Sequence, residues 1–415
     1  MSLKVIAPNK LKGKVVLPSS KSISNRALVI NALSGNSCAP ENVSDCDDTK
    51  VMISWLGNHP DIVDIGAAGT AMRFSSALLA VSEGTHVITG TERMKNRPIG
   101  ILVDALRSLG AKIEYAEKEG FPPLKITGNA EMEGGEISLQ GSVSSQYISA
   151  LLMIGPILKK GLKLELTGNI VSRPYINMTI AIMREFGAEA EWTGDNVIKV
   201  APTPYASRPY FVESDWSGAS YWYEMMAISD DAEAEIVLPG LFANSLQGDS
   251  GVAKLFESLG VHTEHKGNDV VLSKNGECVD ILEYDFVEMP DLAQTFVVTC
   301  CMLGVPFHFK GLQSLKIKET DRIEALKVEL AKLGFCIEDR NDSELLWDGV
   351  NVILDDKAIE EVAIDTYEDH RMAMAFAPVA LKNGAIKINN PQVVSKSYPR
   401  YWTDLESAGF QCTED

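Results

Sequence analysis

The feature that most constrains the fold is a local pattern that recurs six times along the chain. Each copy is a short strand, a small or polar turn, and an apolar helix rich in Ala, Ser and Met. The helices are predicted to begin near Ser22, Thr70, Ser145, Ser217, Leu292 and Arg371, at intervals of 48, 75, 72, 75 and 79 residues. Repetition of this kind is typical of stacked supersecondary units.

A second recurring signal completes the unit. An amphipathic helix ends in an apolar residue and Gly, the usual left-handed helix end, and an extended segment follows. These pairs are Leu56-Gly57, Leu109-Gly110, Phe186-Gly187, Leu259-Gly260, Leu333-Gly334 and Ala408-Gly409. The unit therefore reads βαβαββ over about 75 residues. The first copy is predicted to lack a strand pair, because Thr70 follows Gly57 by 13 positions, whereas the corresponding difference in the other copies is 30 to 37.

A chain of 415 residues is too long for one core, so six units predict two domains of three. The fold class is therefore α/β (α+β), with two globular domains and a shortened first unit. We expect the chain to cross between domains at residues 18–20 and to return near Glu213. One domain would then be 20–212 and the other 1–19 plus 213–415, and ligands tend to bind in the cleft that such an arrangement leaves.

Composition narrows the possible partners. A net charge of −19 argues against nucleic acid or an anionic membrane as partner. There is no run of about 20 apolar residues and no secretory signal pattern. The seven cysteines form no CxxC pair and no Cys/His grouping suggests a metal. We therefore expect a cytoplasmic monomer without metal or cofactor.

If the six helices begin near one place, the turns before them should carry the chemistry. These turns hold Lys21 and Ser22; Gly69 and Thr70; Ser144, Ser145 and Gln146; Glu213 and Asp215; Asp291; His370 and Arg371. A helix N-terminus offers free N–H groups and a positive dipole end, which favour a phosphate. Lys21 and Arg26 would add charge on one helix face. A capped helix with solvated basic residues is the alternative reading of this stretch.

Basic residues recur at equivalent points of four units, in segments 95–98, 172–175, 318–322 and 396–399. The cations gathered in this way are Lys21, Arg26, Arg97, Lys318, Arg322, Arg371 and Lys396. Guanidinium groups bind carboxylate and phosphate bidentately, so the set predicts about two substrates with several negative charges. Asp291, Glu319 and His370 lie among these cations as candidate acids and bases. Gly66–Gly69 lacks the GxGxxG spacing of a dinucleotide site.

Several segments resemble the 5-enolpyruvylshikimate-3-phosphate (EPSP) synthase family, the 3-phosphoshikimate 1-carboxyvinyltransferases. The matching segments, in family order, are 21–26, 68–73, 93–100, 143–146, 171–175, 318–322, 369–374 and Lys396. The resemblance implies the inverse-barrel-like architecture of enolpyruvyl transferases, with three βαβαββ units per globule. It also implies the reaction. The 5-hydroxyl of shikimate 3-phosphate attacks C2 of phosphoenolpyruvate, and the tetrahedral intermediate then loses phosphate.

The resemblance assigns roles residue by residue. Shikimate 3-phosphate would be bound by Lys21, Ser22, Arg26, Ser144, Ser145, Gln146, Ser172, Tyr175, Asp291 and Lys318. Phosphoenolpyruvate would be bound by Lys21, Gly69, Arg97, Gln146, Arg322, Arg371 and Lys396. The catalytic set would be Asp291 as base for the 5-hydroxyl, Lys318 as its proton-transfer partner, Glu319 as acid at the methylene carbon, nearby His370, and Lys21.

Two positions depart from the family pattern. Ala67 stands where the family often has Asn, and Phe74 stands where Pro usually follows Met-Arg. Both border the expected phosphoenolpyruvate site, where glyphosate competes. Gly69 leaves room for glyphosate, so the chain is expected to be a glyphosate target.

Two alternatives compete with this interpretation. UDP-N-acetylglucosamine enolpyruvyl transferase shares the fold, but it presents a reactive Cys on the loop that corresponds to 92–100 and an Asn after its first Lys. Here the loop has no Cys, and Ser22 follows Lys21. An inactive binding protein of this fold would have lost Asp291, Lys318 or Glu319, and all three are present.

Overall fold

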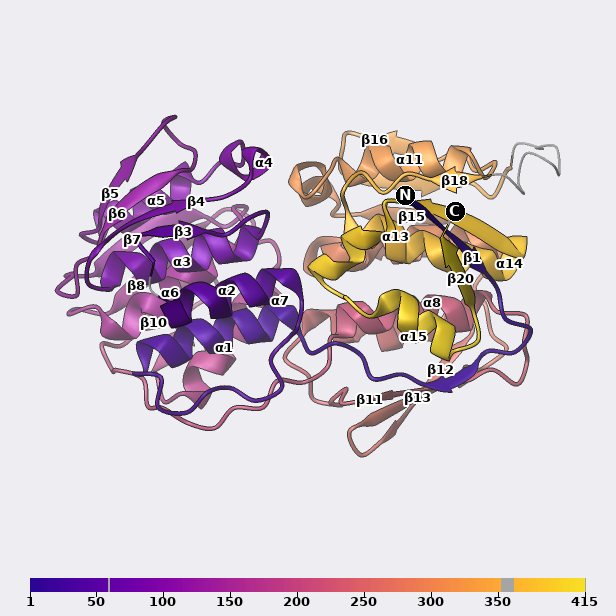
Figure 1. The fold of residues 1–415 in the computed structure, drawn as a ribbon, viewed down its shortest axis with the longest axis horizontal. Helices are drawn as coiled ribbons and strands as arrows, with labels where there is room; N and C mark the ends of the chain where they lie inside the picture. The colour runs from indigo at the N-terminus through magenta and orange to yellow at the C-terminus, as the bar shows by residue number, and fades with distance from the viewer. Residues whose placement is uncertain (59, 352–361, 415) are drawn as a thin grey trace. The chain divides into compact units, whose positions relative to one another are not determined.

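A computed structural model describes residues 1–58, 60–351 and 362–414 of the chain (Figure 1). The chain divides into two compact units. The N-terminal unit is Ser19–Glu213, and the C-terminal unit combines Met1–Pro18 with Ser214–Asp415. That these units are separate functional domains with the assigned substrate roles stays a prediction.

The strands of the described residues form five four-stranded sheets that share one topology. In each sheet the first two strands of a unit pair in parallel, the second pairs antiparallel with the fourth, and the fourth pairs antiparallel with the third. The sheets are β3-β4-β6-β5, β7-β8-β10-β9, β2-β11-β13-β12, β14-β15-β17-β16 and β18-β19-β1-β20. This order is that of the predicted βαβαββ unit, and the predicted α/β class is confirmed.

The N-terminal unit holds two complete βαβαββ elements. The first is β3 (Ile62–Asp64), α3 (Gly69–Val81), β4 (Thr85–Thr89), α4 (Glu92–Lys95), α5 (Gly100–Ser108), β5 (Lys112–Tyr115) and β6 (Leu124–Thr127). The second is β7 (Gly135–Gln140), α6 (Ser145–Ile154), β8 (Leu162–Thr167), α7 (Arg173–Glu185), β9 (Ala190–Trp192) and β10 (Val197–Val200). The remaining element has helices α1 (Lys21–Leu33) and α2 (Asp47–Asn58), and between the described ends of α2 and β3 there is no room for the strand pair predicted to be missing.

The C-terminal unit holds three elements. The first two are β2 (Lys12–Lys14), α8 (Trp216–Ile228), β11 (Glu235–Pro239), α9 (Val252–Glu257), β12 (Val261–Lys266) and β13 (Asp269–Lys274), then β14 (Leu282–Asp285), α10 (Ala293–Leu303), β15 (Phe307–Lys310), α11 (Arg322–Ala331), β16 (Glu338–Arg340) and β17 (Glu344–Trp347). The third is β18 (Ala363–Ile364), α13 (His370–Phe376), α14 (Ala380–Asn383), β19 (Ala385–Asn389), α15 (Tyr401–Ser407), β20 (Gln411–Glu414) and β1 (Ser2–Ile6).

The six predicted helix starts all lie within one residue of the observed ones. The predicted helix ends agree with the structure at most positions but not at all of them. Gly110, Gly187, Gly260, Gly334 and Gly409 have positive φ, but Gly57 lies inside α2, which runs on to Asn58. Gly57 does not adopt the positive φ of a helix-ending glycine, so α2 continues through it.

The strands that precede two of the predicted helices belong to other sheets. β2 precedes α1 in the sequence, yet it pairs in parallel with β11 of the C-terminal unit. Phe211, which precedes α8, forms a parallel bridge with Glu41 of the N-terminal unit. Because the chain is expected to cross between domains at residues 18–20 and near Glu213, each of these strands is expected in the other domain from the helix that it precedes. Local patterning reports strand–turn–helix order, whereas hydrogen bonding decides which sheet receives the strand.

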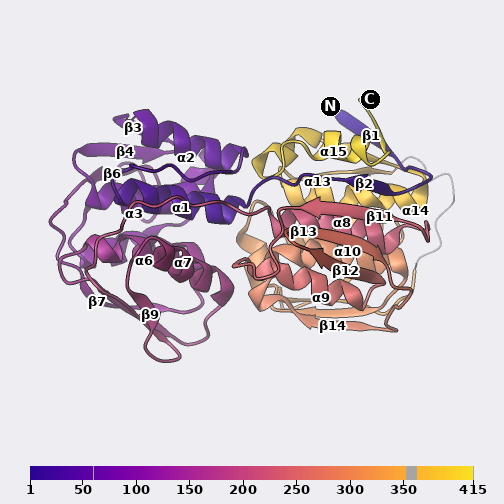
Figure 2. The ribbon, with the colours of Figure 1, turned by 90° about the horizontal axis from the view of Figure 1, so that it is seen from below.

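Buried helices form the interior of each unit. All but one of the residues of α3 and of α8 are buried, as expected for helices that are apolar on every side. Figure 1 shows α8 and α13 in the interior of the C-terminal unit, and Figure 2 shows α6 and α7 beside one another in the N-terminal unit. In the described part of the chain, no helix is long and apolar enough to cross a membrane.

One buried group opposes folding at neutral pH. Glu224 in α8 is 0% exposed, and neither of its carboxylate oxygens has a hydrogen-bond partner among the described residues. Burial raises the pKa of Glu224 well above its usual value. The folded chain therefore holds a proton that the unfolded chain releases, so stability is greatest below the ordinary pKa and falls as pH rises through the raised one.

Glu224→Gln should therefore raise the free energy of unfolding at pH 7 by about 2–3 kcal/mol. The gain should nearly vanish at pH 4, where the unfolded carboxyl is largely protonated too. Urea unfolding at the two pH values measures the difference. Glu233→Gln, on the exposed surface, is the control and should change little. A variant no more stable than the parent chain at pH 7 would contradict this reading.

Candidate active site

The predicted acid/base residues come together in the C-terminal unit. Asp291 lies in the 3-10 turn η4 (Pro290–Leu292), which leads into α10. Its Oδ1 lies 3.2 Å from Arg322 Nη1 and 3.5 Å from Lys318 Nζ. Its Oδ2 lies 2.9 Å from Arg371 Nη2, and its backbone carbonyl accepts from Arg371 Nη1 at 3.1 Å. One carboxylate thus contacts three of the predicted cations.

Arg322, the first residue of α11, joins the other carboxylates to this group. Its side chain is 1% exposed. Its Nε donates to Asp369 Oδ2 at 2.7 Å and its Nη2 donates to Glu319 Oε2 at 2.9 Å. Glu319 Oε1 in turn accepts from Lys396 Nζ at 2.8 Å. We call this set the carboxylate cluster: Asp291, Glu319 and Asp369 with Lys318, Arg322, Arg371 and Lys396.

Asp369 is a member that sequence reasoning missed. It caps α13, where its Oδ1 accepts from Arg371 N at 2.9 Å, and it is fully buried. The turn before it is strained, because Tyr367 and Glu368 both adopt left-handed φ angles of 52° and 57°. His370 follows, 2% exposed, with Nδ1 3.7 Å from Asp369 Oδ1. An Asp just before a helix is usually an N-cap, so the sequence predicts only that role for Asp369. No local pattern predicts that Asp369 also pairs with Arg322.

The electrostatics of the cluster follow from these contacts. Burial alone would raise the pKa of Asp291, but Arg371, Lys318 and Arg322 hold it well below its usual range. Burial likewise opposes ionisation of Glu319, yet Arg322, Lys396 and His370 keep the pKa of that carboxyl well below normal. Burial would lower the pKa of Arg322, but Asp369, Glu319 and Asp291 raise it above its usual value. Asp291, Glu319 and Arg322 are therefore ionised at neutral pH.

In the N-terminal unit, Lys21 begins α1 and its Nζ lies 3.5 Å from Asp48 Oδ2. The Asp48 side chain is 6% exposed and sits in the first turn of α2, where the helix dipole favours a carboxylate. Sequence reasoning missed Asp48, since an acidic pair at a helix start is ordinary. The contact holds the lysine ammonium at the start of two helices.

Arg26 is buried in the same unit among neutral partners. Its Nε donates to Thr179 Oγ1 at 2.7 Å, its Nη2 to Ser149 Oγ at 3.1 Å and its Nη1 to the Ser22 carbonyl at 2.8 Å. Its guanidinium lies over the ring of Phe74 at 5.3 Å. Burial lowers the pKa of Arg26 to about 10. Phe74, a departure from the family pattern, thus supports a predicted substrate residue.

The predicted serines stand at two helix starts. Ser144 caps α6, because its Oγ accepts a hydrogen bond from Gln146 N at 3.3 Å. Ser172 precedes α7 with a left-handed φ of 54°, and within the described chain its hydroxyl makes no cap bond. The two preceding loops touch, because Val171 N donates to Gly141 O at 3.1 Å. Side by side, two helix N-termini form a site suited to phosphate.

Three of the residues predicted for phosphoenolpyruvate meet at the start of α3, whereas Arg322, Arg371 and Lys396 lie in the carboxylate cluster. A Cβ added at Gly69 would lie 2.7 Å from Arg97 Nη1 and 3.1 Å from Arg73 Nη1, so both guanidiniums approach the glycine. Gln146 Nε2 donates to Thr70 Oγ1 at 3.0 Å, which joins the starts of α6 and α3. Ala67 is exposed beside them. The structure thus brings Gly69, Arg97 and Gln146 together, and it adds Arg73.

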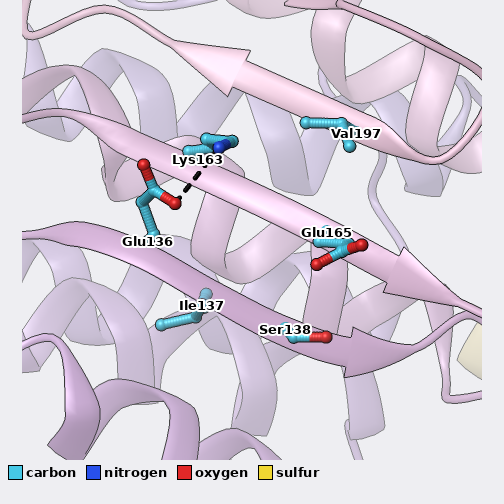
Figure 3. A pocket seen from close by; sticks show the side chains of 6 residues that line it. All are labelled: Glu136, Ile137, Ser138, Lys163, Glu165 and Val197. Carbon is cyan, nitrogen blue, oxygen red and sulfur yellow. Dashed lines mark hydrogen bonds and ion pairs between the residues drawn. The ribbon is translucent and has the colours of Figure 1, made fainter.

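A pocket on the surface of the sheet β7-β8-β10-β9 differs in its charge from the sites described above (Figure 3). It lies over β7, β8 and β10 and is lined by Glu136, Ile137, Ser138, Lys163, Glu165 and Val197. Lys163 Nζ is paired with Glu136 at 3.1 Å. Two carboxylates and one paired lysine give this pocket the wrong charge for an anionic substrate.

Repeated βαβαββ elements, with cations and serines at helix starts, define an α/β protein whose helix starts are suited to anions. The family model for EPSP synthase (3-phosphoshikimate 1-carboxyvinyltransferase) matches residues 5–59 and 56–405. The chain therefore belongs to the EPSP synthase family, and the resemblance inferred from its sequence is confirmed.

Known relatives agree with this assignment. A 3-phosphoshikimate 1-carboxyvinyltransferase of Bacteroides fragilis is 61% identical over 404 residues, covering 97% of each chain. The protein of that name from Photobacterium damsela subsp. piscicida is 38% identical over 426 residues, covering 96% of this chain and 97% of its own. A solved EPSP synthase from Acinetobacter baumannii, 20% identical, has the same fold at a TM-score of 0.79 over 100% of both chains.

Proposed function

We propose that the chain transfers the enolpyruvyl group of phosphoenolpyruvate to the 5-hydroxyl of shikimate 3-phosphate and releases phosphate. The observation that carries this proposal is the carboxylate cluster, in which Asp291 contacts Lys318, Arg322 and Arg371. Such a group can accept a proton, and its cations can bind an anionic substrate. The chain's family and its relatives' names support the same reaction.

The two helix starts that carry Ser144, Ser145 and Ser172 would bind the phosphate of shikimate 3-phosphate. The rest of that substrate would contact Lys21, Ser22, Arg26, Gln146, Tyr175, Asp291 and Lys318. The phosphate of phosphoenolpyruvate would lie against Lys21, Gly69, Arg97, Gln146 and Lys396, and its carboxylate against Arg322 and Arg371. Arg322 and Arg371 are paired with carboxylates of the chain, so a substrate carboxylate that binds them would have to exchange with these partners.

This exchange explains how Asp291 becomes a base. A carboxylate held by three cations binds protons weakly. When the phosphoenolpyruvate carboxylate draws Arg322 and Arg371 away, the pKa of Asp291 rises and it can take the 5-hydroxyl proton. In the same way, Lys396 leaves Glu319 for the substrate phosphate, and Glu319 can then carry the proton that it gives to the methylene carbon. His370 lies beside Glu319 and contributes positive charge there.

The test is a phosphate-release assay with phosphoenolpyruvate and each acceptor in turn. Release that requires shikimate 3-phosphate supports the proposal. Release with UDP-N-acetylglucosamine instead would assign the sister activity, and binding of shikimate 3-phosphate without release would assign an inactive binding protein.

A Gly69→Ala substitution should lower kcat/KM for phosphoenolpyruvate by about tenfold to a hundredfold. The added Cβ would lie 2.7 Å from Arg97 Nη1, so the guanidinium must move and a charge-assisted contact of about 1.5–3 kcal/mol weakens. The flexible arginine end can yield, so the fold should persist. Gly57→Ala is the matched control, because its Cβ meets nothing within 4 Å. Equal kcat/KM values for the two variants would contradict the contact.

Three further expectations belong to this proposal. Glyphosate should compete with phosphoenolpyruvate, and unchanged turnover at millimolar glyphosate would contradict this.

A cytoplasmic location is supported by the free state of all seven cysteines, which suits a reducing compartment. A monomeric state is tested by sedimentation with and without substrates.

A further inference from the structure

A buried acid outside the predicted site lies close to the carboxylate cluster. Asp249 belongs to the 3-10 turn η2 (Gly248–Gly251) and is 3% exposed. Ser217 Oγ in the first turn of α8 donates to its Oδ2. Its Oδ1 has no hydrogen-bond partner within the described part of the chain. A half-satisfied buried carboxyl costs stability, so its retention calls for a reason.

The turn that carries Asp249 is fixed against the start of α8 and the segment before Asp291. Gln247 Oε1 accepts from Trp216 N at 3.1 Å, and its Nε2 donates to the Ser214 carbonyl at 2.8 Å. A Cβ on Gly251 would lie 2.7 Å from Met289 Sδ, so η2 packs against the residue just before η4. Asp249 therefore cannot turn away to solvent without breaking these contacts.

Three charged groups act on Asp249 from the surrounding elements. They are Asp291 of η4, Arg371 of α13 and Asp215, which caps α8. The neutral form of Asp249 is favoured by burial and by the negative charges of Asp291 and Asp215. Its anion is favoured by Arg371 and by the Ser217 hydrogen bond. Together these effects raise the pKa of Asp249 to about 7. The buried Asp249 carboxyl is therefore within electrostatic reach of Asp291 and Arg371, and its charge can change in the working pH range.

We propose that Asp249 is a positioning residue that, when neutral, leaves Arg371 to Asp291 and to the substrate carboxylate and, when ionised, competes with them for that guanidinium. This inference rests on the proposed function, because it assigns Arg371 to phosphoenolpyruvate. The ionised form lowers the positive potential where the substrate carboxylate binds. Affinity for phosphoenolpyruvate should therefore fall as pH rises through 7, while the chemical step is less affected.

The experiment compares pH profiles of kcat and of kcat/KM for phosphoenolpyruvate in the parent chain and in Asp249→Asn. The amide keeps the shape and imitates the neutral acid. The parent-to-variant ratio of kcat/KM should fall by about tenfold between pH 6 and pH 8, through KM more than kcat. Taking the ratio cancels the ionisation of the substrates themselves. A ratio independent of pH would overturn the inference.

Ser217→Ala is the second variant, in case Asp249→Asn does not fold. Removing a donor to the carboxylate disfavours the anion, so the inflection should move to higher pH. An inflection that stays in place in Ser217→Ala would also overturn the inference. Failure of the proposed function is distinguishable, because the parent chain would then release no phosphate at any pH.

Discussion

Arg322→Met should lower the free energy of unfolding by about 3–5 kcal/mol and abolish turnover. The guanidinium is 1% exposed and donates to Asp369, Glu319 and Asp291 at 2.7, 2.9 and 3.2 Å. Methionine fills much of the space but leaves three carboxylates without their shared partner. An unpaired buried charge costs far more than the pair itself contributes, so the loss is large although the network as a whole is not strongly stabilising.

Chemical denaturation at several pH values measures this loss. The pKa values of Asp291 and Glu319 are lowered in the folded chain, so the stability that they contribute is present above their ordinary pKa and disappears as pH falls through the lowered values. The difference between Arg322→Met and the parent chain should therefore shrink in acid.

Arg340→Met is the matched control, because Arg340 pairs with Glu338 at 2.7 Å on the exposed strand β16. Such a surface pair contributes about 0–1 kcal/mol. Similar losses in both variants would mean that the buried network is not what Arg322 supports.

Asp291→Asn should reduce kcat by about 10²- to 10⁴-fold while the chain stays folded. The amide has the size of the carboxylate but cannot take the 5-hydroxyl proton. It also leaves Lys318, Arg322 and Arg371 with one anion fewer, so binding of phosphoenolpyruvate should not weaken and its KM should not rise. A fall in kcat without a rise in KM separates a base from a residue that only binds substrate.

Single-turnover measurements with saturating substrates test this expectation, with circular dichroism to confirm folding. The control is Asp285→Asn, in the same segment, where an exposed carboxylate caps η3 (Phe286–Glu288) through Val287 N at 2.9 Å. Asn can cap as Asp does, so that variant should keep its turnover. If kcat for Asp291→Asn stays within tenfold of the parent value, Asp291 is not the base.

Much of the fold follows from local patterns that survive tertiary packing. The six apolar helices begin where small or polar turns end, and each observed start lies within one residue of the predicted one. The paired strands that close each unit were also foreseeable, because their glycines and extended segments recur. The chain was predicted to cross between domains at residues 18–20 and near Glu213, but the strands that pair with β2 and Phe211 were not predicted, because pairing over more than 150 residues leaves no mark in the local pattern.

The candidate site likewise has a part that could be predicted from the sequence and a part that could not. The cations and serines could be named from the sequence, because an acidic chain has reason to concentrate Lys and Arg only where anions bind. Their partners could not be named. Asp48, Asp369 and Asp249 look like ordinary helix-start or turn acids. Asp48 and Asp369 are distinguished only by their buried contacts with Lys21 and Arg322, and Asp249 only by its burial within electrostatic reach of the carboxylate cluster.

The amino-acid sequence by itself determined the βαβαββ repeat, the shortened first unit, the family and the inventory of charged residues. These depend on residue type and short-range spacing, which a sequence states directly. Only the tertiary structure decided which carboxylate pairs with each cation, which sheet each crossing strand enters, and which acidic side chains are desolvated. The physical reason is that pairing and desolvation act between residues that are distant in the chain, and their energies depend on packing that local sequence does not encode.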